Sequence, residues 1–234
     1  LMTDRKISEK ATTAQKVQKE GVTPPRRPGR PSGVKKGVDK RELLLDAALK
    51  LFAQSGIAET PLSMIAKEAG VTTAMLHYYF NTREQLLDVL IDERFQPVRA
   101  GFSDIFDIHA DDPLMAITSM AQCMIDAAVK YPWVAPLWVR EVISESGMLK
   151  KRMEERNGDK NRKIVHDCIT RWQAEGRLNP ELDPALLFIT LFGLTLFPLA
   201  SMKMRQGAPS PISPEALRKH VSVLLFHGVA PQKL

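Results

Sequence analysis

The stretch from residue 60 to residue 80, TPLSMIAKEAGVTTAMLHYYF, constrains the fold more than any other part of this chain. Thr60 is a suitable N-cap for a helix, and Pro61 fits the first helical position, where its missing N–H costs nothing. Gly70 supplies the left-handed backbone conformation that ends a helix, and Val71 can cover the core beside the turn. The stretch therefore predicts two short helices joined by a tight turn.

These two predicted helices have the side chains that a helix-turn-helix needs. Their inward positions recur at helical spacing and are Leu62, Ile65, Ala66, Ala69, Leu76 and Tyr79 or Phe80. Because Ala66 and Ala69 are small, the two helices can cross closely. The second helix, capped by Thr72 or Thr73, would then be free to enter a DNA major groove. An ordinary helical hairpin within a bundle is the alternative that this pattern alone leaves open.

Further helices are predicted on either side of this stretch. Residues 39–55 should form a helix that supports the helix-turn-helix from behind. Its apolar stripe consists of Leu43, Leu44, Ala47, Ala48, Leu51 and Phe52. A fourth helix is expected to begin at Asn81 or Thr82, to pass Pro97 with a kink and to end near His109.

Residues 41–90 resemble the DNA-binding domain of the TetR family of bacterial transcriptional regulators. The resemblance rests on RELLLDAALKLFAQSGIAETPLSMIAKEAGV and on LHYYFNTREQLL. His77 stands where a tyrosine is usual in the family, and Arg83 stands where a lysine is usual. Arginine can still hold a phosphate, so the second change is mild. The resemblance implies DNA contacts at Thr60, Thr72, Thr73, Ala74, Met75, His77, Tyr78, Tyr79 and Arg83.

The positive charge of the chain is concentrated in its first 41 residues. They hold 12 Lys and Arg against 4 Asp and Glu, whereas the remaining residues hold 21 against 23. A basic segment without an apolar face favours a polyanionic partner, and nucleic acid fits better than a membrane surface. Residues 1–38 are polar and rich in Lys, Thr, Pro and Gly, so we expect a largely disordered basic arm.

Within this arm, residues 25–31, PRRPGRP, resemble an AT-hook in which Pro28 replaces the first arginine of the Arg-Gly-Arg-Pro centre. The resemblance implies that Arg27 and Arg30 contact the narrow minor groove of A·T-rich DNA, with Gly29 allowing the backbone to approach. A solvated basic tail without a defined site is the alternative, and both interpretations stay open.

The chain is helical in pattern from Pro113 onward, and no sustained alternation predicts a strand. The expected helices span residues 114–129, 132–144, 148–175, 185–202 and 214–229. The fourth of these is the most apolar, and as a membrane span it would lie at the short limit for a bilayer core. We favour a helix that packs on its own core with one face and on a second subunit with the other. The last two helices resemble the dimerisation pair of the family.

No pattern in the chain predicts catalysis, a cofactor or a metal site. A Gly-rich segment, PGRPSG, follows no strand, and no nucleophile elbow is present. His166, Asp167 and Cys168 are adjacent on a predicted helix, so their side chains cannot converge on one atom. Cys123 and Cys168 make no disulfide framework, and the first 40 residues contain no apolar core of a signal peptide. A cytoplasmic protein that is not an enzyme is expected.

A small-molecule effector is the ligand that the resemblance implies for the C-terminal half. The wide, soft side chains that commonly line such pockets are Met120, Met124, Trp133, Trp138, Trp172, Phe192 and Phe197. Arg140, Glu141 and His166 are candidate polar anchors if they face inward. Ordinary core packing is the alternative for each of these residues taken singly.

The sequence therefore predicts an all-α protein with three parts: a basic arm (1–38), a helix-turn-helix domain (39–82) and a helical effector-binding and dimerisation domain (83–234). The predicted function is a homodimeric regulator of transcription, a repressor that a small-molecule effector releases from an inverted-repeat operator on double-stranded DNA. An effector-independent architectural protein that prefers A·T-rich DNA is the main alternative. A membrane-tethered regulator and an enzyme with a nucleic-acid module are two further alternatives.

Overall fold

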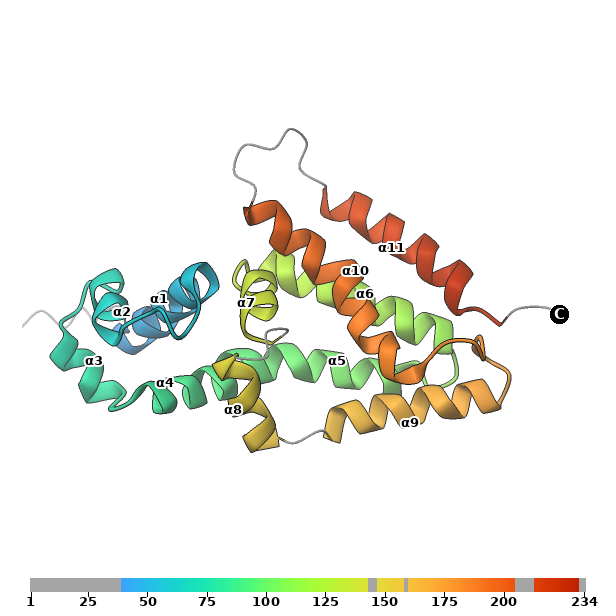
Figure 1. The fold of residues 1–234 in the computed structure, drawn as a ribbon, viewed down its shortest axis with the longest axis horizontal. Coiled ribbons are helices and arrows are strands. Elements are labelled where there is room, and N and C mark those ends of the chain that lie inside the picture. The colour runs from blue at the N-terminus through green and yellow to red at the C-terminus, as the bar shows by residue number, and fades with distance from the viewer. Residues whose placement is uncertain (1–38, 143–146, 158–159, 205–212, 232–234) are drawn as a thin grey trace, which may run out of the picture. The chain divides into compact units, whose positions relative to one another are not determined.

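A computed structural model describes residues 39–142, 147–157, 160–204 and 213–231 of the chain. Every element in these ranges is helical, which confirms the predicted all-α class (Figure 1). The elements are α1 (Lys40–Ser55), α2 (Leu62–Glu68), α3 (Thr73–Tyr79), α4 (Arg83–Leu90), the π-helical turn η1 (Ile91–Phe95), α5 (Gln96–Ile108), α6 (Pro113–Lys130), α7 (Val134–Glu141), α8 (Met148–Asn157), α9 (Lys160–Ala174), α10 (Pro184–Met204) and α11 (Pro214–Val229).

The first four helices build a compact head around helix α1. Asp39 caps α1 by accepting a hydrogen bond from the Arg41 amide, and Gly56 ends the helix at a φ of 89°. The buried side of α1 includes all of the predicted stripe except Leu43, which is 37% exposed. Leu45 and Leu49 are buried in addition, because α1 is covered on more than one side. Helix α1 is thus the central support that the sequence predicted.

Helices α4 and α5 run on from one another through a π-helical turn, and the predicted kink at Pro97 takes this form. The Gln96 amide donates to the carbonyl of Ile91, five residues back, just before the proline. Pro97 has no N–H to donate to the preceding turn. The extra residue in η1 accommodates this missing hydrogen bond without ending the helix. The helix then continues to Ile108, close to the predicted end.

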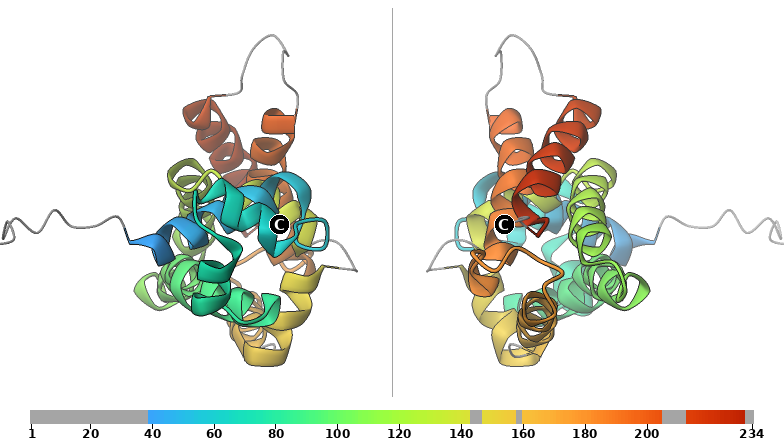
Figure 2. Two further views of the ribbon diagram at one scale, coloured as in Figure 1. Left: turned by 90° about the vertical axis from the view of Figure 1, so that its left-hand side faces the viewer. Right: turned by 90° about the vertical axis from the view of Figure 1, so that its right-hand side faces the viewer.

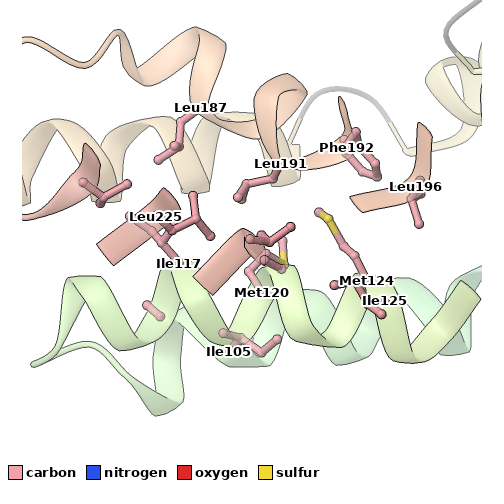
Figure 3. Packing of buried hydrophobic residues seen from close by; sticks show 14 of the residues in the cluster. Ile105, Ile117, Met120, Met124, Ile125, Leu187, Leu191, Phe192, Leu196 and Leu225 are labelled. Atoms are coloured by element: carbon pink, nitrogen blue, oxygen red, sulfur yellow. The ribbon is translucent and has the colours of Figure 1, made fainter. Parts of the chain in front are cut away.

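The C-terminal helices bury a second hydrophobic core, to which α5, α6, α7, α9, α10 and α11 all contribute. Figure 3 shows its centre, where Met120 and Met124 of α6 face Leu191 and Phe192 of α10. The views of Figure 2 show α10 and α11 side by side, and both pack on α6. This core is separate from that of the head, although α7 contributes residues to both.

One stretch of the chain differs from the predicted elements. The single helix predicted for 148–175 is two helices, α8 and α9, with residues 158–159 between them outside the described ranges. Helix α8 packs on the head, because Leu149 and Met153 are buried in the head core. The head core therefore also includes residues from beyond the boundary that the sequence analysis placed at residue 82.

Helix α10 is the one described helix that is long and apolar enough to cross a membrane, with a mean hydropathy of 1.9 over residues 184–201. An apolar core helix passes the same test of length and composition. Here α10 packs against α6, α7 and α9 and buries Leu187, Leu191 and Leu196. Its opposite side leaves Leu186, Ile189 and Phe197 exposed. The helix thus has one face in the core and a second apolar face without a partner in the described residues.

Candidate nucleic-acid interface and effector region

The turn between α2 and α3 has the hydrogen bonds of a helix C-cap with glycine in the left-handed position. Gly70 has a φ of 67°, the Val71 amide donates to the carbonyl of Ala66 at 3.0 Å, and the Gly70 amide donates to Lys67 at 3.1 Å. Half-buried Val71 packs against the head core. Thr72 is the cap of α3, since its hydroxyl accepts from the Met75 amide at 3.2 Å. The turn therefore fixes the direction in which α3 leaves the head.

Thr60 has a different place from the one the sequence predicted. Helix α2 begins at Leu62 with Pro61 at its cap position, and no side chain caps it. Thr60 is fully buried, and its hydroxyl donates to the carbonyl of Gly56 at 2.7 Å. The interpretation of Thr60 as an N-cap is wrong, and its buried side chain is not available to DNA. The residue instead closes the loop between α1 and α2.

Helix α3 presents one exposed face and buries the other. Leu76 is fully buried and Phe80, just after the helix, is almost so. The exposed side chains on the opposite face are those of Thr73, Ala74, His77 and Tyr78, with Thr72 exposed at the start of the helix. Tyr78 is 83% exposed and touches the ring of Tyr79 edge-on at 5.2 Å between centroids. Met75 and Tyr79 lie half-buried at the sides of this face.

Arg83, at the first position of α4, holds the loop that precedes α2. Its guanidinium donates to the carbonyl of Thr60 at 3.2 Å and to that of Ala58 at 3.4 Å. A guanidinium has five N–H donors, so further donors are left for an anion. Arg83 is half-buried, and Thr82 caps the same helix by accepting from the Gln85 amide. The predicted phosphate ligand is therefore also a structural link between α4 and the loop.

Ion pairs fix α4 and η1 to their neighbours. Asp88 of α4 accepts two hydrogen bonds at 2.7 Å from Arg152 of α8, and Arg156 of the same helix lies 3.0 Å away. These contacts, led by the hydrogen bond from Arg152, hold the pKa of Asp88 below its ordinary value. On the other side, η1 pairs with α1 through Glu93 and Arg41. The helix that leaves the head is thus held by ion pairs to α8 and to α1.

The proposed minor-groove contacts of the arm, Arg27 and Arg30, lie outside the described residues. The AT-hook-like interpretation of residues 25–31 therefore stays a prediction.

Several of the predicted effector residues lie in the C-terminal core. Met120, Met124, Trp172 and Phe192 are buried there, and half-buried Trp138 of α7 stacks on Phe192 with ring centroids 4.6 Å apart. Trp172 also stacks on Phe106 and donates its indole N–H to the carbonyl of Ala110 at 3.2 Å. Packing of α9 accounts for Trp172. The stack of Trp138 and Phe192 is where α7 meets α10.

The remaining predicted effector residues lie elsewhere. Trp133 is half-buried and packs against both cores, with its ring 4.9 Å from that of Phe95. Phe197 is 55% exposed on the outer face of α10. The sequence could not place either residue, because both helices have apolar side chains on more than one face.

The polar anchors predicted for this region do not face it. Arg140 and His166 are exposed, and the contact of His166 is with its neighbour Asp167 at 3.5 Å. Glu141 is buried, yet its Oε1 accepts from the Ile57 amide at 2.8 Å and so faces the head. The condition set for these three, that they face inward toward this region, is not met here. Helical spacing does not reveal which face a neighbouring helix covers.

Arg99 of α5 is a half-buried cation that was not predicted from the sequence. It lies on α5 four residues after Phe95 and three before Phe102, both of which are core-facing side chains. Arg99 is half-buried and has no hydrogen bond or ion pair with any described residue, and burial lowers its pKa from the ordinary value. The spacing Phe95-Arg99-Phe102-Phe106, an apolar stripe broken by one arginine, is the signal that could have identified it.

The described residues contain no group of three or more His, Cys, Asp or Glu side chains that could hold a metal ion. Cys123 and Cys168 are free, and burial raises the pKa of both thiols. Neither of them is activated as a nucleophile by its surroundings.

Comparison with known proteins supports the interpretation of the head as a helix-turn-helix domain. A family model described as "Bacterial regulatory proteins, tetR family" matches residues 44–90, from α1 to the end of α4. RutR, an HTH-type transcriptional regulator of Escherichia coli K12, is 30% identical over 162 residues, which is 67% of this chain and 72% of RutR. SrpR, an HTH-type transcriptional regulator of Pseudomonas putida, is 24% identical over 147 residues, 62% of this chain and 66% of SrpR.

Solved structures extend the likeness to the C-terminal helices. The ketosteroid transcriptional regulator KstR2 of Mycobacterium tuberculosis has a TM-score of 0.65 to this structure at 21% identity. The match covers 84% of this chain and 97% of KstR2. At this identity the likeness concerns the fold.

Proposed function

Because this chain belongs to the TetR family of bacterial regulatory proteins, we propose that it is a homodimeric transcriptional repressor. In this proposal it binds an inverted-repeat operator in the cytoplasm, and a small-molecule effector releases it. Its relatives RutR and SrpR are transcriptional regulators by name, and that coarser function holds for the family as a whole.

The exposed face of α3 is the observation that carries the proposal. One side of α3 is buried in the head, and the other side exposes Thr73, Ala74, His77 and Tyr78. A helix of this kind reads bases from the major groove, while cations at its flanks bind phosphates and set the register. Arg83 is such a cation at the start of the next helix. The exposed tyrosine, which packs on little of its own chain, has no other evident role.

The outer faces of α10 and α11 are the proposed surface for a second copy of the chain. The exposed large apolar side chains on these two helices are Leu186, Ile189, Phe197, Val223, Leu224 and Phe226. On α10 the exposed positions Leu186, Thr190, Gly193 and Phe197 recur at helical spacing and form one stripe. Gly193 has nothing within 4 Å of the position of a Cβ, so a neighbouring helix could approach closely there. A second copy fits this surface because it would bury two such stripes against each other.

The effector is proposed to bind beside the stack of Trp138 and Phe192, where α7, α6 and α10 meet. The surrounding side chains, Met124 among them, are apolar and adaptable. Arg99 is the cation best suited to an effector with an anionic group, because it is half-buried and lacks a partner among the described residues. Effector binding would favour a spacing of the two heads that no longer matches successive major grooves, about 34 Å apart.

Selection of bound DNA from random genomic fragments at near-physiological salt tests the proposal. We expect an inverted repeat to emerge with the unmodified chain. Tyr78→Ala should remove or change the preference, because this side chain is almost fully exposed and its loss leaves the head core intact. Ile164→Ala, at an exposed position on α9, is the matched control and should select the same repeat as the unmodified chain. A pool without any repeat would contradict the proposal.

A second candidate function rests on the charge of residues 1–41, which hold 12 basic and 4 acidic side chains. An architectural protein would use this charge to bind DNA broadly, with a steep dependence on salt and little preference among sequences. The same selection distinguishes the two functions, since architectural binding would enrich A·T-rich DNA without a repeat. Deletion of residues 1–38 would then abolish binding, whereas a repressor would keep its choice of operator and lose only affinity.

A further inference from the structure

A buried carboxylate joins the C-terminal domain to the reading head. Glu141, the last residue of α7, is 6% exposed, and its Oε1 accepts a hydrogen bond of 2.8 Å from the amide of Ile57, which is itself fully buried. The same oxygen lies 3.4 Å from the position that a Cβ on Gly56 would take. Burying a carboxylate is costly unless a partner compensates for lost hydration, so this contact holds α7 and the loop in one relative position.

The loop that donates this hydrogen bond, through the Ile57 amide, leads directly into the helix-turn-helix. It joins α1 to α2, and Arg83 of α4 donates to its carbonyls at Ala58 and Thr60. A carboxylate from α7 therefore holds the start of the loop, and a guanidinium from α4 holds its end. A displacement of Glu141 would therefore act on the residues just before α2. The loop groups involved are the Ile57 amide and the carbonyls of Ala58 and Thr60.

The other end of this connection is the proposed effector region. Trp138 lies three residues before Glu141 on α7 and stacks on Phe192 of α10. Helix α7 also contributes Leu137 to the head core and Ala135 to the C-terminal core. A short helix with residues in both cores moves as one body, because its backbone hydrogen bonds are internal.

The main chain of Glu141 also lies very close to Gly147. A Cβ at Gly147 would lie 1.8 Å from the carbonyl oxygen of Glu141, so only glycine fits beside it without a shift. The backbone of Glu141 thus lies close to Gly147, just before α8, and its carboxylate accepts a hydrogen bond from the loop.

We propose that the hydrogen bond between Glu141 and Ile57 transmits a change at Trp138 to the helix-turn-helix. This inference rests on the proposed function for its consequence on DNA. Glu141 is a positioning residue, since it contacts neither the DNA nor the effector in this mechanism. The link runs through α7 to the loop before α2. It does not involve α5, η1 and α4, the continuous helical segment that also joins the head to the C-terminal helices.

Hydrogen exchange on the full chain tests the link without knowledge of the effector. Trp138→Ala removes the ring on Phe192 and serves as the perturbation. We expect it to speed exchange of the Ile57 amide at least tenfold in the unmodified chain and in Glu141→Gln, which keeps an acceptor oxygen. In Glu141→Met, which lacks the acceptor, exchange should already be fast and Trp138→Ala should change it less than twofold. Ile164→Ala is the control that should leave this amide unchanged.

The amides of α6 show whether a variant has loosened as a whole, because they belong to the core that Trp138 and Phe192 share. A selective response at residue 57 supports the link, and equal acceleration of α6 overturns it. If Glu141→Met does not fold, the Gln and Trp138→Ala variants still decide, since an Ile57 amide that ignores Trp138→Ala overturns the inference.

Affinity for a selected operator provides the second readout, which a merely structural role of Glu141 would not change in this pattern. Trp138→Ala should alter the dissociation constant about tenfold in the unmodified and Glu141→Gln chains and less than twofold in Glu141→Met. Equal factors in all three backgrounds would overturn the inference. A chain that shows the exchange pattern but binds no sequence specifically would overturn the proposed function and leave the link between α7 and the loop standing.

Discussion

At the scale of single residues, Arg83 combines two tasks that a substitution can separate. Arg83→Ala should weaken binding to all DNA sequences by a similar factor and lower the slope of log affinity against log salt by about 1, as the loss of one phosphate contact does. Arg83→Lys keeps the charge and should keep the slope. It should lower thermal stability, because lysine cannot hold the carbonyls of Ala58 and Thr60 in the same fork.

Titration of operator and unrelated DNA at several salt concentrations measures both effects. Lys163→Ala, at an exposed position on α9, is the matched control for loss of one positive charge away from α3. A change of preference between sequences in Arg83→Ala would mean that the side chain reads bases and is not a phosphate ligand.

How well single residues could be predicted from the sequence depended on the kind of constraint. Gly70 and Thr72 follow from local backbone chemistry, and both have the predicted roles at the turn. The same chemistry predicted Thr60 as the N-cap of α2, and that prediction is wrong. The Thr60 hydroxyl instead donates to the carbonyl of Gly56 within the loop. Arg140 and His166 required knowledge of which helices cover α7 and α9, and one sequence does not contain that information.

At the scale of elements, the ion pairs between α4 and α8 are expected to contribute to stability. Asp88→Asn should lower the free energy of unfolding at pH 7 by about 1–2 kcal/mol. This value lies between the cost of breaking an exposed ion pair and that of breaking a buried one. Glu155→Gln removes an exposed outer partner of Arg152 and should cost less than about 0.5 kcal/mol. Chemical denaturation of the three chains measures these differences.

The pH dependence of this contribution follows from the lowered pKa of Asp88 in the folded chain. The unfolded chain takes up a proton on this carboxyl at a higher pH than the folded chain does, so the stabilisation is complete above about pH 4–5. It is lost as the pH falls from there through the lowered folded pKa. The difference between the unmodified chain and Asp88→Asn should therefore be constant from pH 5 to 8 and shrink near pH 3. An undiminished difference at pH 3 would mean that packing, and not charge, explains the effect.

The elements themselves were predicted better than their connections. Helix caps and apolar periodicity predicted helix over the described helices, although α8 and α9 were predicted as one, and Gly56 and Gly176 end α1 and α9 at positive φ. The π-helical turn before Pro97 could not be predicted, since a proline inside a helix can be accommodated by a kink, a break or an extra residue. The packing of α8 on the head was missed for a related reason: its sequence MLKKRMEERN is mostly charged, and only Leu149 and Met153 are buried in the head core.

At the scale of the whole molecule, the proposed function requires two heads that act on one operator. The proposed surface on α10 and α11 can be tested at Gly193, because in a single chain a Cβ added there would meet nothing within 4 Å outside the adjoining backbone. Gly193→Arg should leave the fold of each subunit intact, and could stabilise it, since glycine inside a helix costs about 1 kcal/mol relative to alanine. In a dimer that pairs these faces, the same arginine would be buried without a partner at the point of closest approach.

We therefore expect Gly193→Arg to be a monomer by sedimentation at micromolar concentration, with unchanged helical content. Its affinity for the operator should fall about a hundredfold or more, because one head can no longer hold the second half-site at high effective concentration. Ile164→Arg places the same charge on an exposed apolar position of α9 and should remain a dimer with full affinity. A Gly193→Arg chain that still sediments as a dimer would move the subunit interface away from α10. A monomer that keeps full affinity for the complete inverted repeat would mean instead that one head carries the recognition, and the two-fold mechanism of release would no longer apply.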